Sequence, residues 1–270
     1  MKSDHIRKGA RSLKDIPTDI LSQLNNGEIE TVNLMEWLAV DQYFLLKKVL
    51  TQSNKECYFE NIESQIAQLK NQSVLHMSKL IGQELMLATL AADDLDWFMD
   101  LLKHRSDSVR CWVCYGIAVH PNWTLTQKFE QIKNPAQDSH FGVREVAWMA
   151  MRPLIIENLD ESLSILTGWA KNDNANVRRF ACEATRPRGV WCNHIQVLKN
   201  SPQKALALLD SLSQESEKYV KDSVGNWLND ASKSDPDFVQ ELCQDWKKFN
   251  NKDTDYMIKR ALRTLVKNKI

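Results

Sequence analysis

A short stretch of this sequence combines four cations, one carboxylate and one indole. Its members, in chain order, are Arg178, Arg179, Glu183, Arg186, Arg188 and Trp191. Guanidinium groups bind phosphates in a fixed forked geometry, and a tryptophan ring stacks on bases or attracts a cation. A carboxylate held among these groups can stabilise a developing positive charge. The stretch therefore predicts a site for a polyanion.

The same stretch is expected to begin as a helix. Asn174 or Asn176 would cap its first turn, because amide side chains satisfy the free backbone N–H groups there. Pro187 would end it, since proline cannot continue the backbone hydrogen bonds. The apolar residues of the two turns share one face: Val177, Phe180, Ala181 and Ala184.

The composition indicates a mainly helical protein with no net charge. The chain has 270 residues, only 8 Gly and 7 Pro, and 35 basic side chains balanced by 35 acidic ones. Scarce glycine and proline beside many Leu, Lys, Glu and Ala residues favour helix over strand. Zero net charge excludes a globally basic nucleic-acid coat protein, so polyanion binding must depend on how the charges are distributed.

No targeting or membrane segment is expected. No apolar run approaches the ~20 residues that span a bilayer, and the first residues lack the apolar region of a secretory signal. We therefore expect a cytoplasmic protein with no membrane partner. The 6 cysteines are scattered, which fits a reducing compartment. Cys111 and Cys114 form a C-x-x-C that suits structural thiols or, alternatively, metal or redox use, but no second pair completes a zinc set. We expect no metal and no cofactor.

From Asp93 onward the sequence repeats itself. Helices with the same apolar offsets begin at Val109, Val143, Val177, Val220 and Ile258, spaced by 34, 34, 43 and 38 residues. Such irregular spacing is typical of HEAT-like helical pairs. We predict an all-α fold, a right-handed α-α superhelix of HEAT-like repeats forming a curved solenoid. Residues 93–270 would hold five helix pairs, and residues 1–92 a helical segment packed on them.

The remaining helices follow from the same periodicity. Partner helices are predicted at 94–104, 125–134, 161–171, 202–212 and 236–248, and N-terminal helices at 34–50, 60–70 and 73–90. The first 35 residues carry Arg7, Lys8, Arg11 and Lys14. They suit either a mobile, solvated terminus or a basic arm that reaches a phosphate backbone.

A basic residue follows the first apolar position of every repeat. These residues are Arg110, Arg144, Arg178, Lys221 and Lys259. Two interpretations remain open for them: contact with phosphates, or a ladder of ion pairs with acids of adjacent repeats such as Asp107, Asp173, Asp222 and Asp255.

Helical geometry selects further candidates. Offsets +2, +5 and +9 are expected to point away from the core at about 100° per residue. They hold Arg179, Cys182 and Arg186 in the third repeat, and Glu145, Trp148 and Arg152 in the second. Outward arginines with aromatic residues suit phosphates and stacked bases. Trp148 would then be a second aromatic contact beside Trp191, unless it pads a helix interface.

Two carboxylates, Glu183 and Asp230, lie on a shared flank of the third and fourth repeats. Stacking of adjacent repeats would bring them near each other. A carboxylate that faces a polyanion repels it, so each is either part of an arginine ladder or retained for chemistry.

These residues resemble those of a known family. The run VRRFACEATRPRGVW, then YVKDSVGNWLNDASKSDPD and IKRALRTLVK, is similar to the HEAT-like DNA alkylation-repair proteins, the AlkC and AlkD group of alkylpurine DNA glycosylases. E-x-x-R-P-R-x-x-W and L-N-D place the chain nearer the AlkC branch. The resemblance covers residues 93–270. It implies that Glu183, Trp191 and Asp230 are the functional acid, aromatic and acid. His140 departs from the pattern, because the resemblance implies a glutamate there, and Glu145 stands five residues away.

The resemblance implies a function that fits this chemistry. Such proteins excise cationic N3- or N7-alkylated purines from DNA, and a carboxylate and an indole can stabilise the departing charge. We therefore predict a monomeric protein that binds double-stranded DNA and acts as a monofunctional glycosylase. His140 is a third catalytic candidate that would polarise water or, alternatively, contact a phosphate. Arg144, Arg152, Arg178, Arg179, Arg186, Arg188, Lys221 and Lys259 would hold phosphates. The alternative is a non-catalytic HEAT-like scaffold that binds DNA or a protein partner.

Overall fold

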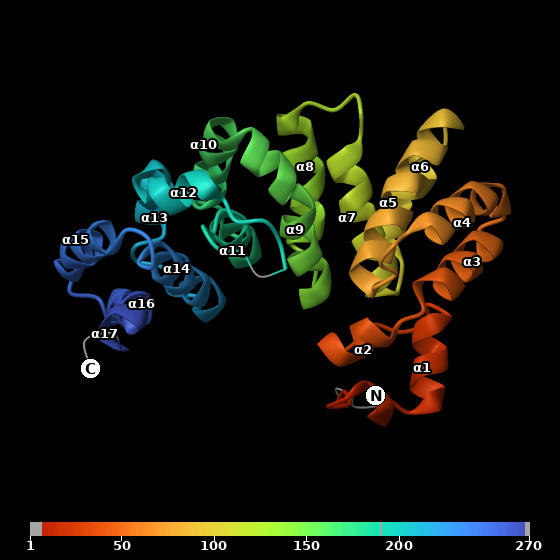
Figure 1. The fold of residues 1–270 in the computed structure, drawn as a ribbon, viewed down its shortest axis with the longest axis horizontal. Coiled ribbons are helices and arrows are strands. Elements are labelled where there is room, and N and C mark those ends of the chain that lie inside the picture. Colours follow the sequence, from red (N-terminus) through yellow and green to blue (C-terminus); the bar gives the residue numbers. More distant parts are fainter. Residues whose placement is uncertain (1–6, 190, 268–270) are drawn as a thin grey trace. The chain divides into compact units, whose positions relative to one another are not determined.

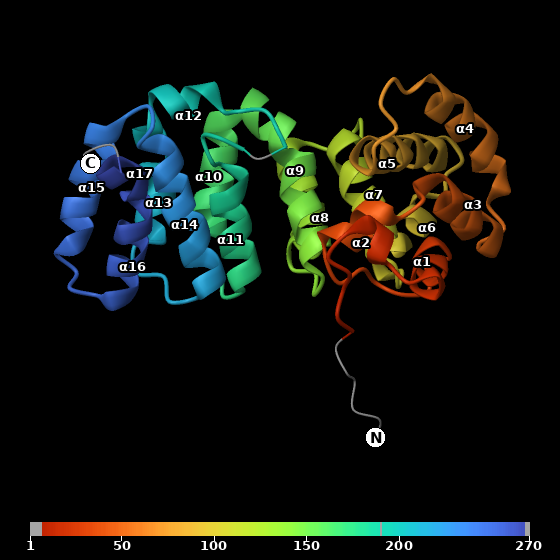
Figure 2. The same ribbon diagram turned by 60° about the horizontal axis from the view of Figure 1, so that its bottom comes forward.

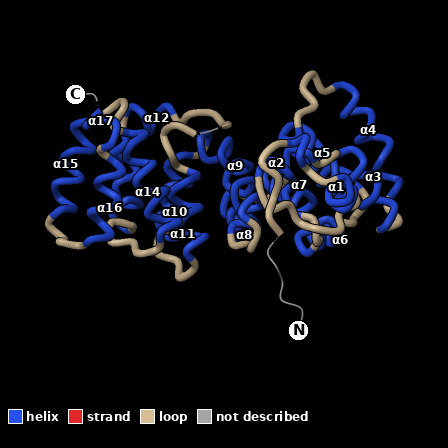
Figure 3. Tube along the Cα trace, turned by 90° about the horizontal axis from the view of Figure 1, so that it is seen from below, coloured by secondary structure: helices blue, strands red, loops and turns tan. Residues whose placement is uncertain are grey.

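A computed structural model describes residues 7–189 and 191–267 (Figure 1). Within these ranges the secondary structure is α-helix and short 3-10 helix, with no strand (Figure 3). The chain divides into two compact units, residues 1–147 and 148–270. The expectation of an all-α fold is confirmed for the described residues. The predicted partition at residue 92 rests on the repeat pattern and stays a prediction.

The first unit contains eight α-helices, three 3-10 helices and the start of a ninth α-helix, within the described residues. They are η1 (Leu13–Asp15), α1 (Thr18–Asn25), α2 (Leu34–Ala39), α3 (Gln42–Gln52), η2 (Glu56–Tyr58), α4 (Phe59–Gln68), α5 (Val74–Ala91), α6 (Leu95–Asp100), η3 (Leu101–Lys103), α7 (Asp107–Val119), α8 (Leu125–Ala136) and α9 (Phe141–Glu157), which ends in the second unit.

The second unit is also built of helices within the described residues. Its elements are α10 (Leu159–Trp169), α11 (Ala175–Ala184), α12 (Gln196–Asn200), η4 (Pro202–Ala205), α13 (Leu206–Ser211), α14 (Lys218–Ala231), α15 (Pro236–Lys247), α16 (Lys252–Ala261) and α17 (Arg263–Lys267). Helices α11, α14 and α16 pack side by side in one layer, and α10, α13 and α15 form a second layer against them (Figures 1 and 2).

The repeat pattern identified the layer that carries the candidate site. The five predicted inner helices are α7, α9, α11, α14 and α16, and their predicted partners contain α6 with η3, α8, α10, η4 with α13, and α15. The apolar stripe is buried in the first four repeats. In the fifth, Leu262 and Leu265 are half-buried, because α16 ends at Ala261. No helix among the described residues has the length and apolarity to cross a membrane.

Small residues let neighbouring helices of the first unit approach closely. A Cβ atom at Gly82 in α5 would lie 2.0 Å from the backbone oxygen of Trp112 in α7. Because that obstacle is backbone, we expect Gly82→Ala to lower the free energy of unfolding by about 1–3 kcal/mol. Gly168→Ala in α10 is the matched control, since nothing lies within 4 Å of its Cβ position. There the gain in helix propensity should stabilise by up to about 1 kcal/mol. Urea unfolding curves measure both, and equal behaviour of the two variants would contradict the prediction.

The N-terminal residues differ from expectation in two ways. The predicted helix 34–50 is two helices, because the Asp41 side chain accepts from the backbone N–H of Phe44 and starts a new helix there. The expectation of a solvated terminus is wrong for Leu24 and Thr31, which are buried. Thr31 is 2% exposed. Its backbone N–H and its hydroxyl both donate to the buried carboxylate of Asp107 at the start of α7, at 2.9 and 2.8 Å. Lys8, Arg11 and Lys14 are exposed, so the basic-arm alternative stays a prediction.

Candidate active site and nucleic-acid interface

Helix α11 starts and stops where its sequence indicated. The side chain of Asn174 caps it by accepting from the backbone N–H of Asn176 at 2.8 Å, which confirms the predicted cap. The helix ends at Ala184, because the proline at 187 cannot continue it. Between α11 and α12, the described residues Arg186, Pro187, Arg188, Gly189 and Trp191 lie outside any helix.

Two carboxylates from adjacent repeats meet at one guanidinium at the end of α11. Arg186 donates from Nη1 to Oε1 of Glu183 at 2.6 Å, and from Nη2 and Nε to Oδ2 of Asp230 at 2.7 and 2.9 Å. Ser223 of α14 donates from Oγ to the other oxygen of Glu183 at 2.6 Å. The side chains of Glu183 and Asp230 are 7% and 6% exposed. The expectation that stacking brings the two acids together is confirmed, and we call these four residues the ionic cluster.

Further cations surround the ionic cluster. Arg179 places Nη2 3.6 Å from Oε2 of Glu183, one helical turn away, and its guanidinium lies 4.5 Å from the ring centre of Tyr219. Lys233 lies 3.2 Å from Oδ1 of Asp230 and is partly exposed. Arg188 donates to the backbone oxygen of Asp230 and to Oγ of Ser234. Four basic side chains, Arg179, Arg186, Arg188 and Lys233, thus surround the two acidic ones.

The electrostatics hold Glu183 in its charged form. Burial raises the pKa of the Glu183 carboxyl, but Arg179, Arg186 and the hydrogen bond from Ser223 outweigh it, so the pKa lies below the usual range. The two carboxylates conversely raise the pKa of Arg186 despite its burial. A carboxyl whose pKa falls on folding stabilises the folded state above its unfolded pKa of about 4.3, and this contribution disappears as the pH drops.

Ser223→Ala should weaken that contribution. The substitution leaves Oε2 of Glu183 without its buried hydroxyl donor, so we expect a loss of about 1–3 kcal/mol in the free energy of unfolding at pH 7. The pKa of Glu183 in the folded state should rise toward its unfolded value of about 4.3, so the loss should shrink as the pH falls below about 4 toward the lowered folded-state pKa of the parent, below which the carboxyl is protonated in parent and variant alike. Urea unfolding of the variant and the parent between pH 3 and 7 measures this. A loss that is the same at every pH would contradict it.

Trp191 is presented outward on a strained backbone. It is 61% exposed, and its φ of 61° lies in the left-handed region. Bulky residues rarely adopt that region, because the Cβ atom crowds the backbone, at a cost of order 1–3 kcal/mol. An exposed indole that gains little from burial and tolerates this strain is a candidate for contact with a ligand.

Arg152 fixes the loop that carries Trp191. It is 1% exposed, and its guanidinium donates to three backbone oxygens: Nη1 to Ala184, Nη2 to Arg186 and Nε to Asn193, at 2.9, 2.6 and 2.8 Å. A Cβ atom at Gly189 would lie 2.1 Å from Sγ of Cys192 and 3.2 Å from this guanidinium, so a larger residue there would have to displace the Cys192 side chain. The prediction that Arg152 points outward to hold phosphate is wrong, because its donors serve the loop.

Two other outward predictions are also wrong. Cys182 is completely buried and Trp148 is 4% exposed, although offset +5 was expected to face away from the core. In α11 the reason is the second layer: α10 and α13 cover one flank of the helix while α14 covers another. Trp148 therefore fits the padding alternative, and it is not an exposed aromatic. Arg179 and Arg186 remain half-buried.

The basic residue at offset +1 follows one structural rule in three repeats. Arg110, Arg144 and Arg178 each use Nη1 to bind the backbone oxygens six and five residues earlier. Arg110 also pairs with Asp138 of the next loop.

At the same offset, ion pairs with the following loop also occur in the third and fourth repeats. Arg178 pairs with Glu215, and Lys221 pairs with Asp253. The Glu215 hydrogen bond raises the pKa of Arg178. These contacts favour the ladder interpretation for these positions, with acids other than those expected. Lys259 is exposed and stays a candidate for phosphate contact.

His140 serves a different part of the molecule. It belongs to the first unit, whereas Glu183 and Asp230 belong to the second. It is 7% exposed; its Nε2 lies 2.6 Å from the backbone oxygen of Thr31, and its Nδ1 accepts from Gly142 N–H at 3.2 Å. These contacts account for His140 as a clamp on the N-terminal segment, so no ring nitrogen is left for the predicted role in polarising water.

Two members of the site escaped the sequence reasoning. Ser223 could have been identified from the sequence, because it is the one hydroxyl residue in the predicted apolar stripes. At the same offset the other repeats carry Trp112, Val146, Phe180 and Ala261. Lys233 could not have been identified in this way, because nothing marks an exposed lysine at the end of a helix. Cys111 and Cys114 are free and completely buried, and burial raises the pKa of both thiols, which suits structural residues.

The fold and the repeated helix pairs define a HEAT-like α-helical repeat protein. Residues 45–265 match the model of the DNA alkylation repair enzyme family, and the chain belongs to that family. The uncharacterized protein YhaZ of Bacillus subtilis (strain 168) is 37% identical over 118 residues, which are 44% of this chain and 33% of that protein.

Solved structures share the fold. Alkylpurine DNA glycosylase AlkC of Pseudomonas fluorescens, bound to DNA containing an abasic site analog, superposes with a TM-score of 0.67 at 21% identity, over 96% of this chain and 66% of that chain. AlkD2 from Streptococcus mutans gives 0.54 at 22% identity, over 70% and 95%. This chain thus spans a third of the Bacillus protein's length and about two thirds of the Pseudomonas chain's. Identities this low support the shared fold alone.

Proposed function

We propose that this protein binds double-stranded DNA as a monomer in the cytoplasm and hydrolyses the N-glycosidic bond of cationic N3- or N7-alkylpurines. Membership of the DNA alkylation repair enzyme family supports this assignment. The observation that carries it is local: two buried acidic side chains from adjacent repeats, paired with one guanidinium, lie at the loop that presents an exposed indole on a strained backbone. Packing explains the helices around this site, but it does not explain that combination.

For this reaction the protein needs to supply mainly charged groups and a fixed orientation of the substrate. Alkylation makes the purine cationic, so the base leaves as a neutral molecule when the bond from C1′ to its nitrogen breaks and the electron pair goes to the base. The sugar becomes an oxocarbenium ion; water then adds at C1′ and loses a proton. A carboxylate stabilises the sugar cation and orients the water, while Trp191 attracts the cationic base through its ring. We assign the carboxylate role to Asp230, with Glu183 holding Arg186 in place.

The phosphate contacts follow from which cations remain accessible. Arg188 and Lys233 flank Asp230 and are partly exposed, and Lys259 is exposed on α16. We propose these three, with Arg179, as the phosphate-binding residues. Arg178 and Lys221 pair with acids of the next repeat instead, and Arg144 binds backbone oxygens of the loop before α9. Because phosphate contacts release counterions, affinity for duplex DNA should fall steeply with salt.

The decisive experiment is a base-release assay on N-methylated duplex DNA, with the freed bases separated by chromatography. The parent should release 3-methyladenine or 7-methylguanine. Asp230→Asn should lower the rate by about 10²–10³-fold, the loss typical when one transition-state partner is removed. It should still bind duplex DNA, because the basic residues remain. Trp191→Ala, at an exposed position, tests the indole without a packing penalty. Unchanged release by Asp230→Asn would remove the assignment.

A second function is favoured by the pairing of both acids with Arg186. A carboxylate saturated by a guanidinium is typical of a structural ladder, and a HEAT-like scaffold that binds DNA without chemistry would need nothing more. This alternative predicts duplex binding with no base release under any condition. The same assay, run beside a binding measurement, separates the two.

A further inference from the structure

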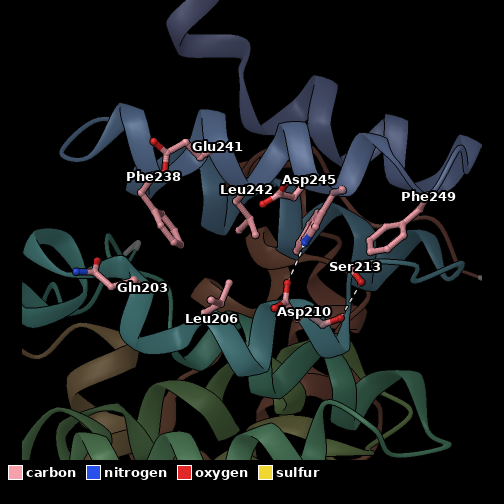
Figure 4. A pocket seen from close by; sticks show the side chains of 10 residues that line it. Gln203, Leu206, Asp210, Ser213, Phe238, Glu241, Leu242, Asp245 and Phe249 are labelled. Carbon is pink, nitrogen blue, oxygen red and sulfur yellow. Dashed lines mark hydrogen bonds between the residues drawn. The ribbon is translucent and has the colours of Figure 1, made fainter.

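A groove on the second unit lies between the short helices η4 and α13 on one side and α15 on the other, and it has a volume of about 640 Å³ (Figure 4). Its apolar side chains are Leu206, Phe238, Leu242, Trp246 and Phe249. Leu206 rises from α13, while Phe238 and Leu242 descend from α15 toward it. Leu206 and Phe249 are 37% and 45% exposed, so this apolar surface is open to solvent.

The charge on the groove has a single sign. Its lining includes Asp210, Glu241 and Asp245 but no lysine, arginine or histidine. Asp210 accepts from the indole N–H of Trp246 at 3.0 Å, and this hydrogen bond holds the Asp210 side chain in the wall of the groove. Asp245 pairs with Lys248, one turn away and exposed. Glu241 is exposed and has no ion pair among the described residues. The groove is thus apolar along its length and negative at its rim.

This pattern excludes DNA and selects a cationic occupant. A polyanion would be repelled by three carboxylates with no compensating cation in the lining. The groove also belongs to the layer of α13 and α15, whereas the ionic cluster belongs to α11 and α14. An occupant of the groove therefore does not compete for the residues proposed to contact DNA.

We propose that this groove docks a basic amphipathic segment of a partner protein. Its apolar face would lie on Leu206, Phe238 and Leu242, as in other helix-in-groove complexes. Its lysine or arginine side chains would reach Glu241 and Asp245. Charge complementarity of this kind sets specificity and the rate of association more than it sets affinity. The proposal is independent of base release and stands for a scaffold as well as for an enzyme.

The first test uses a fluorescein-labelled model helix of leucine and lysine, with its leucine–glutamate counterpart as the opposite-charge probe, by anisotropy on the full chain. The lysine peptide should bind and the glutamate peptide should not. Replacing Glu241→Lys together with Asp245→Lys should weaken binding at least tenfold. Glu60→Lys together with Glu130→Lys makes the same change in net charge at two exposed positions of the first unit, and should alter binding less than about twofold. Equal effects of the two double variants, or equal binding of the two peptides, would overturn the proposal.

The second test locates the peptide. A photoreactive group on the apolar face should form its adducts on α13 and α15, and Leu206→Ser should reduce their yield at least fivefold. Leu206 is more than a third exposed, so this variant should fold, and circular dichroism checks that it does. Adducts confined to α11 or α14 would show that the peptide occupies the proposed DNA surface instead, and the groove would lose its assignment.

Discussion

Replacing Arg186 by methionine is expected to lower the free energy of unfolding by about 3–5 kcal/mol at pH 7. The guanidinium is the shared partner of Glu183 and Asp230, which are both more than nine-tenths buried. Breaking a buried ion pair leaves its other members charged and desolvated, and that loss exceeds the net value of the intact pair. Methionine keeps most of the volume, so the lost charge dominates the result. Urea unfolding curves on the parent and the variant measure it.

The pH dependence separates this cause from lost packing. Without Arg186, the pKa of Glu183 should rise from its lowered value, because Arg179 and Ser223 alone then offset the effect of burial, so the loss relative to the parent should shrink as the pH falls through the titration range of the carboxyl. Adding Glu183→Gln and Asp230→Asn to Arg186→Met should recover most of the loss, because no buried charge then lacks a partner. Arg188→Ala is the control: it binds a backbone oxygen and a serine at the periphery, and it should cost no more than about 1–1.5 kcal/mol. A loss below about 1 kcal/mol for Arg186→Met would contradict the prediction.

The helices that carry this site could be predicted from the sequence, because they repeat with a regular apolar pattern. Apolar residues at 3-to-4 spacing located the five inner helices and their partners, and asparagine before α11 and proline after it marked the ends of that helix. Position in the repeat also brought Glu183 and Asp230 together, since stacked helices align equivalent flanks. These features follow from local rules that a single sequence carries.

The faces that lie between layers were not predictable in the same way. A helical wheel defines one buried face from apolar residues, but α11 is covered on further flanks by α13 and α14. Cys182 is buried for this reason. Nor does a wheel show that an arginine can be buried when loop oxygens surround it, as at Arg152. The loop after α11 has no period, and its path is set by contacts that are distant in sequence.

The sequence alone did not decide whether the basic residue at offset +1 pairs with an acid of another repeat or binds a phosphate. The sequence offers many acids near each basic residue, and only the stacked loops decide which are in reach. Arg178 pairs with Glu215, and Lys221 pairs with Asp253. The expected partners Asp173 and Asp222 have other roles: the backbone oxygen of Asp173 binds Arg178, and the carboxylate of Asp222 binds Lys218.

Replacing Arg152 by methionine should have a comparable effect on stability and a specific effect on the site. Three backbone oxygens, those of Ala184, Arg186 and Asn193, lose a buried donor at once. Each unsatisfied buried acceptor costs about 1–3 kcal/mol, partly relieved where water enters, so a total loss of about 3–5 kcal/mol is expected. Because these oxygens lie at the end of α11 and in the loop that carries Trp191, the amide hydrogens of that loop should also exchange faster than in the parent.

Hydrogen exchange distinguishes this local release from general destabilisation. In Arg152→Met the amides of Thr185, Arg186, Arg188, Gly189, Trp191, Cys192 and Asn193 should lose protection while those of α14 keep theirs. Gly82→Ala, whose clash lies in the first unit, is the control for a destabilised chain with an intact loop. If the proposed function holds, Arg152→Met should also lose base release at temperatures where it is fully folded, because a mobile Trp191 no longer meets the base in a fixed geometry. Uniform loss of protection across the second unit would instead make Arg152 a general packing residue, with no particular role in presenting the indole.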